Sequence, residues 1–314
     1  MIGQTKSPLL KDVSTEHLDA ETKSILELPD EKRLEYIWDR KWITYPLAKQ
    51  ILSRLDFLVS YPRNDKTPCM LLIGDTNNGK TAIARIFCER YKAVPNLETQ
   101  KIMLPVLMVQ APHTAEESRL YNSILKSVCA PFKTTDRVER KLLQVEQILK
   151  SLELKVLIID EFQEILKAKP DKIKNFLSVL KFLNNELLVS VVCIGVKESI
   201  TAITNDPHLA NRFKTTYMPK WKLDADYRRL LASFELMLPL KRASGLAQNK
   251  QLATRIFGMC SGTIGEISEI LKQAAEIAIV TGEERITLDI IDKLEYQSPL
   301  DRVKYYDKII SSAS

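Results

Sequence analysis

A phosphate-binding loop is the feature of this sequence that most constrains its fold. An apolar run, residues 70–73, comes directly before the loop, and a helical pattern, residues 82–91, follows it. Strand, loop and helix in this order distinguish a genuine P-loop from a chance match. The loop has the spacing G-x-x-x-x-G-K-T and consists of Gly74, Asp75, Thr76, Asn77, Asn78, Gly79, Lys80 and Thr81.

Each part of this loop has a role in binding a nucleoside triphosphate. The backbone N–H groups of the loop and the N-terminus of the helix place partial positive charge beside an anion. The ammonium of Lys80 can reach the outer phosphates, and the hydroxyl of Thr81 can bind Mg²⁺. We therefore expect Gly74 to Thr81 to hold the phosphates. A glycine-rich turn with a solvated lysine is the alternative.

Composition indicates a folded protein of one or two domains. The chain has 314 residues, of which 45% are hydrophobic and 27% are charged, enough to build a core. No apolar run is long enough to cross a bilayer, and the five scattered cysteines form no C-x-x-C pair. We expect a cytoplasmic protein with reduced thiols and no membrane partner. The net charge of +6 permits nucleic-acid binding without requiring it.

Apolar runs that alternate with helical patterns predict an α/β domain. Strands that alternate with helices favour a parallel sheet covered on both faces. The expected strands are 70–73, 104–109, 155–160, 188–194 and 215–218, and the expected helices are 45–59, 82–91, 115–129, 137–152 and 171–185.

After Trp221 the pattern becomes entirely helical. The expected helices are 224–240, 246–260, 263–281 and 288–295, and an earlier one covers 31–38. We therefore expect four segments. They are an N-terminal arm with a helix (1–40), the nucleotide-binding α/β domain (41–221), a small all-helical domain (222–297) and a tail (298–314).

A pair of acids follows the third expected strand. The apolar run 156–159 ends in Asp160 and Glu161. In parallel sheets the carboxyl ends of the strands carry the ligand site. Asp160 fits the acid that holds Mg²⁺, and Glu161 fits the base that polarises an attacking water. The alternative is an ordinary strand end with two solvated acids. An acid beside the metal-binding acid favours ATP hydrolysis, as in P-loop ATPases of the additional-strand, catalytic-glutamate type.

Arg212 is a third candidate for the reaction. It follows the fourth expected strand and its helix. In ATPases that form rings or filaments, an arginine at this place projects into the neighbouring subunit's site and stabilises charge on the transferring phosphoryl group. The alternative is an ordinary surface arginine.

Taken together, these motifs resemble the AAA+ superfamily and, more narrowly, the TniB/TnsC group of transposition ATPases. The P-loop and the acidic strand are generic, whereas the Asp-x-Asn-Asn loop and the string around Trp42 are specific. The resemblance covers roughly residues 31–296, and the all-helical domain would be the AAA+ lid. Its strings are 40–48, 71–81, 156–163, 194–213 and 262–267.

Two positions depart from the AAA+ pattern. Gly195 stands at the end of the fourth strand, where many relatives have a polar sensor residue. The lid helix also lacks the arginine that many relatives carry near Gly265. Slow hydrolysis, or hydrolysis that depends on a partner or on DNA, would follow from these departures.

The resemblance implies a mechanism of assembly on DNA. Subunits bound to ATP and Mg²⁺ would form a ring or helical filament on double-stranded DNA, with Arg212 acting on the neighbour's nucleotide. The assembly would recruit a transposase and come apart on hydrolysis. A TniQ-like targeting factor would bias its position, and the involvement of an RNA-guided complex stays open.

Binding to arbitrary DNA uses phosphate contacts rather than base edges. Two polar groups are candidates for these contacts, and for both the alternative is a solvated helix face. The two candidate DNA-binding groups are His113, Thr114 and Arg119, and Lys133, Arg137, Arg140 and Lys141.

Two aromatic residues precede the nucleotide-binding core. Trp42 and Tyr45 either stack near the adenine or pin the N-terminal helix to the sheet.

Two other functions fit the phosphate loop. One is a different AAA+ assembly ATPase, such as a replication initiator or loader. The other is a P-loop kinase that acts on a small molecule. Stimulation of the ATPase by duplex DNA favours the transposition hypothesis, whereas dependence on a small acceptor favours the kinase.

Overall fold

The computed structural model describes residues 15–63, 66–97 and 100–297. The tail expected at 298–314 lies outside these residues. The described chain forms two compact units. One is the continuous stretch Thr44–Pro219, and the other combines residues 15–43 with residues 220–297.

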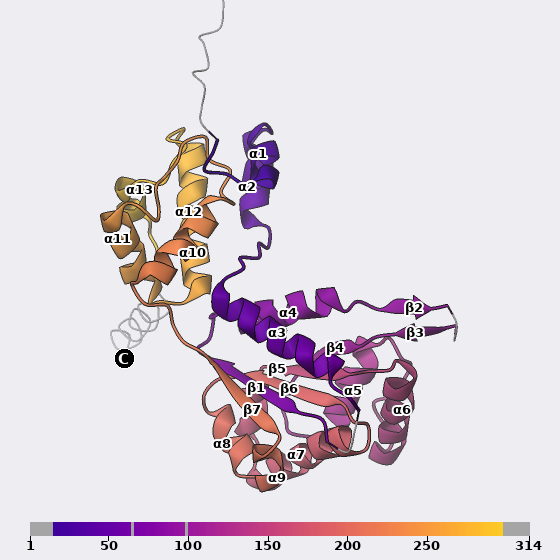
Figure 1. Ribbon diagram of the computed structural model, residues 1–314. Coiled ribbons are helices and arrows are strands. Elements are labelled where there is room, and N and C mark those ends of the chain that lie inside the picture. Colours follow the sequence, from indigo (N-terminus) through magenta and orange to yellow (C-terminus); the bar gives the residue numbers. More distant parts are fainter. Residues whose placement is uncertain (1–14, 64–65, 98–99, 298–314) are drawn as a thin grey trace, which may run out of the picture. The chain divides into compact units, whose positions relative to one another are not determined.

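The unit Thr44–Pro219 is built on a parallel sheet, as the sequence predicted (Figure 1). β1, β5 and β6 are buried at every position, which explains why they are continuous apolar runs rather than alternating ones. β6 lies between β1 and β5, so the strand before the phosphate loop and the acidic strand are not neighbours. In sheet order the strands are β4 (Val106–Gln110), β5 (Val156–Asp160), β6 (Ser190–Gly195), β1 (Cys69–Gly74) and β7 (Phe213–Met218).

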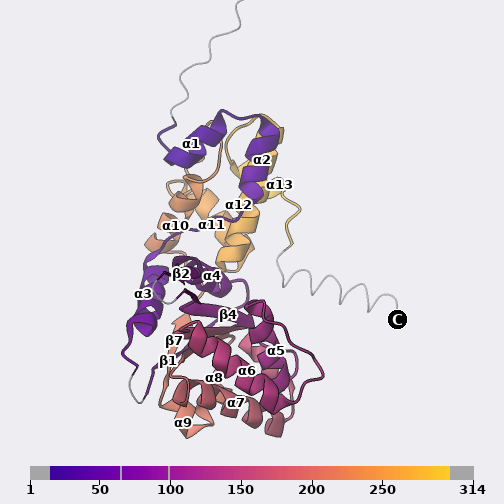
Figure 2. The same cartoon turned by 90° about the vertical axis from the view of Figure 1, so that its right-hand side faces the viewer.

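Helices cover the sheet in two groups. α4 contacts β1 and β4 and packs against α3, whereas α5, α6 and α7 share one hydrophobic core with the strands. Figure 2 shows these last three helices together on one side. Each predicted helix is present. The bounds are α3 (Pro46–Ser60), α4 (Lys80–Arg90), α5 (Glu117–Ser127), α6 (Val138–Ser151) and α7 (Pro170–Asn185).

Five short elements of this unit were not predicted from the sequence. The strands β2 (Val94–Asn96) and β3 (Lys101–Met103) form an antiparallel hairpin that extends beyond the main sheet (Figure 1). Three-residue strands with exposed side chains give no alternating pattern to detect. The others are a 3₁₀ helix η1 (Phe162–Lys167) and the helices α8 (Ser199–Thr204) and α9 (Pro207–Ala210).

The second unit is all helical and draws on both ends of the described chain. The sequence predicts that residues 1–40 form a segment separate from the helical domain. In the structure α2 packs against α12, and Ile37 and Ile43 lie in the same core as the C-terminal helices. The helices are α1 (Ala20–Leu26), α2 (Asp30–Trp38), α10 (Ala225–Glu235), α11 (Lys250–Cys260), α12 (Ile264–Val280) and α13 (Leu288–Lys293).

A buried ion pair fastens α2 to the C-terminal helices. Arg33 is 0% exposed and donates hydrogen bonds to both carboxylate oxygens of Glu284, at 3.0 and 2.5 Å, and to the carbonyl of Pro239. Burial acts to raise the pKa of Glu284. Hydrogen bonds from Arg33 and Lys241 outweigh this effect and hold that pKa below its usual range. The charged pair is therefore part of the folded state.

We expect Glu284→Gln to lower the free energy of unfolding at pH 7 by about 3 kcal/mol, because it removes the buried carboxylate that pairs with Arg33 and leaves the exposed Asp30 as the charged partner of this buried guanidinium. The folded pKa lies below the unfolded value of about 4.3. The pair's contribution is therefore complete above that value and is lost as the pH falls through the folded pKa. Chemical unfolding at several pH values measures this effect. As the pH falls into the acid range, the free energy of unfolding should decrease less steeply for the variant than for the parent protein.

Glu35→Gln is the matched control for this experiment. Glu35 pairs with Lys32 on the exposed face of α2, and an exposed pair contributes less than about 1 kcal/mol. Equal losses for the two variants would contradict a special role for the buried pair.

Candidate nucleotide-binding site

The phosphate loop joins the end of β1 to the start of α4. Asn77 and Gly79 have positive φ angles of 61° and 85°, which asparagine and glycine tolerate best. At Gly74 the backbone of β7 comes so close that a Cβ atom would lie 2.8 Å from the carbonyl oxygen of Met218. These residue types therefore set the curve of the loop.

Asn78 ties the loop to the end of β7. Its side chain is 2% exposed, and its amide nitrogen donates to the carbonyls of Met218 and Pro219, each at 3.0 Å. The sequence predicts only a phosphate contact for Asn78. The structure thus gives the second asparagine of the Asp-x-Asn-Asn string a specific structural partner.

Lys80 is the first residue of α4 and lies over the loop. Its ammonium donates to the carbonyls of Gly74, at 2.8 Å, and Asp75, at 2.7 Å. Burial lowers the pKa of Lys80, and the negative charges of Glu161 and Asp160 oppose that shift. The loop and the two acids thus share one electrostatic environment.

Thr81 and Asp160 meet across the site. The Thr81 hydroxyl donates to the Asp160 carboxylate at 2.8 Å, and Asp160 is 2% exposed. A hydroxyl and a carboxylate in contact supply the oxygen ligands that Mg²⁺ prefers. These two residues therefore fit a magnesium ion beside the phosphate loop.

Glu161 lies at the mouth of the same pocket. Its backbone is in the left-handed region, with a φ of 55°, and its N–H donates to Asp160 Oδ1 at 2.9 Å. The carboxylate of Glu161 is exposed and accepts a hydrogen bond from Gln163. The pocket measures about 320 Å³ and is lined by Thr76, Asn77, Asn78, Gly79, Lys80, Thr81, Ala82, Glu161, Gln163 and Val196.

Arg212 lies away from the residues that line this pocket. It directly precedes β7, and its carbonyl accepts a hydrogen bond from the N–H of Cys69, the first residue of β1. The loop begins at the other end of both strands, where Gly74 pairs with Met218. Five strand steps, roughly 16 Å, separate the two ends. The guanidinium bonds to the side-chain carbonyls of Asn184 and Asn185 at the end of α7.

One of the candidate DNA-binding residues is buried, which corrects the expectation. Lys141 is 0% exposed, and its ammonium donates to the Ser118 hydroxyl and the Thr134 carbonyl, both at 2.8 Å. It fixes the loop before α6 and cannot face DNA. Lys133, Arg137 and Arg140, from the same group, are exposed.

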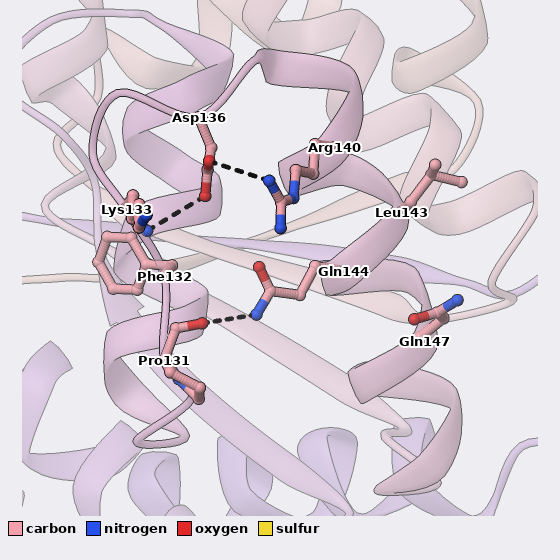
Figure 3. A pocket seen from close by; sticks show the side chains of 8 residues that line it. All are labelled: Pro131, Phe132, Lys133, Asp136, Arg140, Leu143, Gln144 and Gln147. Atoms are coloured by element: carbon pink, nitrogen blue, oxygen red, sulfur yellow. Dashed lines mark hydrogen bonds and ion pairs between the residues drawn. The ribbon is translucent and has the colours of Figure 1, made fainter.

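A groove of about 610 Å³ lies beside these exposed residues (Figure 3). Asp136 accepts from the Lys133 backbone N–H at 3.2 Å and pairs with Arg140 at 3.5 Å. One turn further along α6, Gln144 donates to the Pro131 carbonyl at 2.7 Å. In the other candidate DNA-binding group, Arg119 pairs with Glu116 and His113 contacts Glu164.

Tyr45 is 8% exposed, directly precedes α3, and burial raises its pKa to about 12. Within the part of the chain that the structure describes, none of the helices is both long and apolar enough to cross a membrane.

The fold and site define the class of this protein. A parallel sheet in the order β4-β5-β6-β1-β7, with a P-loop after β1 and paired acids after β5, is an AAA+ ATPase architecture. The family model described as "Bacterial TniB protein" matches residues 33–223, more than half of the chain. The chain belongs to the TniB family.

Solved structures with the same fold include several ORC proteins. The Aeropyrum pernix ORC2 protein, in ADPNP and ADP complexes, is 16% identical, with a TM-score of 0.56 over 82% of this chain and 70% of that one. The A. pernix ORC1 protein in complex with DNA is 21% identical, with a TM-score of 0.53 over 82% and 67%. Drosophila ORC bound to DNA is 16% identical, with a TM-score of 0.57 over 93% and 68%. No curated protein matches the sequence.

Proposed function

We propose that this protein is an ATP-dependent regulator of transposition that assembles on double-stranded DNA. Bound to ATP and Mg²⁺, copies of the chain form a ring or filament on target DNA and recruit the transposase, and ATP hydrolysis takes the assembly apart. A TniQ-like factor directs where it forms. Membership of the TniB family and the P-loop geometry support this proposal.

The position of Arg212 is the observation that best supports the proposed assembly of several copies. The guanidinium lies at the opposite end of the strands from its own pocket, held by Asn184 and Asn185. It cannot contact a phosphate held by its own Lys80. A second copy placed head to tail can receive it, so the nucleotide would lie at a subunit boundary.

The residues of the pocket have separate roles in hydrolysis. The loop N–H groups and Lys80 bind the phosphates. Asp160 and Thr81 would hold Mg²⁺, which would supply positive charge to neutralise the phosphate oxygens. Glu161 accepts a proton from the attacking water. Arg212 of the neighbouring copy stabilises charge on the transferring phosphoryl group.

DNA contacts are assigned to the exposed group Lys133, Arg137 and Arg140. These three basic side chains outnumber the one adjacent acid, Asp136, so the group has a net positive charge. Contacts from such side chains to phosphates bind duplexes of any sequence and weaken as salt rises. This is the behaviour that a protein spreading along arbitrary target DNA requires.

We expect Lys80→Ala to reduce ATP affinity about tenfold to a hundredfold, because it removes charge-assisted hydrogen bonds to phosphate. Assembly driven by ATP should be lost at nucleotide concentrations that saturate the parent protein. Titration with a fluorescent ATP analogue and sedimentation with DNA measure the two effects. Lys197→Ala, at an exposed lysine after β6, is the control and should behave like the parent.

Electron microscopy and ATPase assays with and without duplex DNA test the function as a whole. Rings or filaments on DNA with a non-hydrolysable ATP analogue, and faster ATP hydrolysis with DNA, are the expected results. A protein that stays monomeric and indifferent to DNA under these conditions would overturn the proposal. Hydrolysis that depends on a small acceptor would identify a kinase instead.

A further inference from the structure

The end of β6 has no polar side chain of its own, and another residue occupies the space. A Cβ atom on Gly195 would lie 3.0 Å from Oε1 of Gln163 and 2.5 Å from Oγ of Ser199. Gln163 comes from η1, directly after the acidic strand β5. Glycine at position 195 therefore leaves room for the Gln163 amide between the ends of β5 and β6.

From this place the Gln163 amide reaches Glu161. Its Nε2 donates to Glu161 Oε2 at 2.5 Å, and both side chains line the pocket with Lys80 and Thr81. The opposite amide orientation would point Oε1 at the carboxylate, and two acceptors would repel each other. The hydrogen bond therefore fixes which way the amide faces.

The rest of the Gln163 amide is enclosed. Its Oε1 atom is buried and, within the described residues, has no hydrogen-bond partner, as is also true of the Ser199 hydroxyl. A buried polar atom without a partner costs free energy. Such costs concentrate at functional sites, where the geometry serves the reaction rather than stability.

We propose that Gln163 is a positioning residue that holds the Glu161 carboxylate toward the attacking water. It takes the space that a side chain at position 195 would otherwise fill. Glu161 needs such support because its exposed side chain extends from a left-handed backbone position. This assignment rests on the hydrolytic role proposed above for Glu161.

Gln163→Met tests the assignment in the full-length protein with DNA. Methionine keeps the length and volume of the side chain but lacks the amide. We expect kcat to fall about tenfold to a hundredfold, the effect of losing a hydrogen bond to a charged group. The KM for ATP should stay within about twofold, because the phosphate loop is intact. A merely structural role would leave kcat unchanged.

Gln273→Met is the matched control. Gln273 also donates one side-chain hydrogen bond to a carboxylate, that of Glu269 at 2.7 Å, but it lies on α12 in the helical unit. It should hydrolyse ATP at the parent rate. Gly195→Ala made together with Ser199→Ala tests the same contact from the other side. The alanine Cβ displaces the Gln163 amide without changing Gln163 itself, so kcat should again fall.

A double-mutant cycle with Glu161→Gln shows whether Gln163 acts through Glu161. If it does, Gln163→Met should lower the residual rate of Glu161→Gln little further. Parent activity of Gln163→Met, or an equal fold loss in both backgrounds, would overturn the proposal and leave the proposed function standing. A parent rate for Glu161→Gln itself, or no hydrolysis by the parent protein, would instead overturn the hydrolytic role on which both depend.

Discussion

Arg212→Ala is expected to bind ATP as the parent protein does and yet hydrolyse it at least about a thousandfold more slowly, the loss typical of a missing arginine finger. ATP affinity is retained because Arg212 lies at the far end of the sheet from its own pocket. Arg212→Lys should also fail, because an ammonium lacks the planar fork of a guanidinium. Single-turnover phosphate release and nucleotide titration separate the two quantities.

Mixing two inactive variants tests whether Arg212 acts between subunits. Arg212→Ala keeps an intact pocket, and Glu161→Gln keeps an intact arginine. In a random head-to-tail mixture about a quarter of the interfaces would combine both intact halves, so activity should return. Arg90→Ala is the control, since Arg90 forms an exposed pair with Asp56 in the same unit. No recovery on mixing, or weakened ATP binding by the isolated Arg212→Ala subunit, would argue against a role in trans.

Glu161→Gln is expected to hydrolyse ATP about a hundredfold to ten-thousandfold more slowly, because the amide cannot accept the proton of the attacking water. Lys80, Thr81 and Asp160 are untouched, so ATP should still bind. The assembly on DNA should therefore persist long after the parent protein has dissociated. Phosphate release and retention on immobilised duplex DNA measure the two effects.

Glu164→Gln is the matched control for that variant. Glu164 lies in η1, near Glu161 in sequence, but pairs with Lys167 and His113 instead of facing the phosphate loop. It should behave like the parent protein. Hydrolysis by Glu161→Gln at the parent rate would mean that another group activates the water.

The sheet and the phosphate site could be predicted because their signals are local. Strands buried on both faces leave continuous apolar runs, and a loop that holds phosphate needs a fixed spacing of glycine, lysine and threonine. The hairpin β2–β3 gave no such signal, since its strands have three residues each. Lys141 was misjudged because helical spacing shows which side a charge lies on but not what lies over it.

The relations that the sequence did not reveal depend on contacts across the sheet. Gln163 acquires its place only when β5 and β6 lie side by side and Gly195 leaves a space. Asn78 acquires its partners only when β7 lies beside β1. No spacing along the chain encodes these distances, so a single sequence could not assign either role.

The division of the chain has a consequence for its connectivity. The nucleotide-binding unit is a continuous insertion in the sequence of the helical unit, so the chain passes between the two units twice, after Ile43 and after Pro219. The side chain of Asn78 donates to the carbonyls of Met218 and Pro219, the last two residues before the second passage. The phosphate loop is therefore bonded directly to one of the two covalent connections.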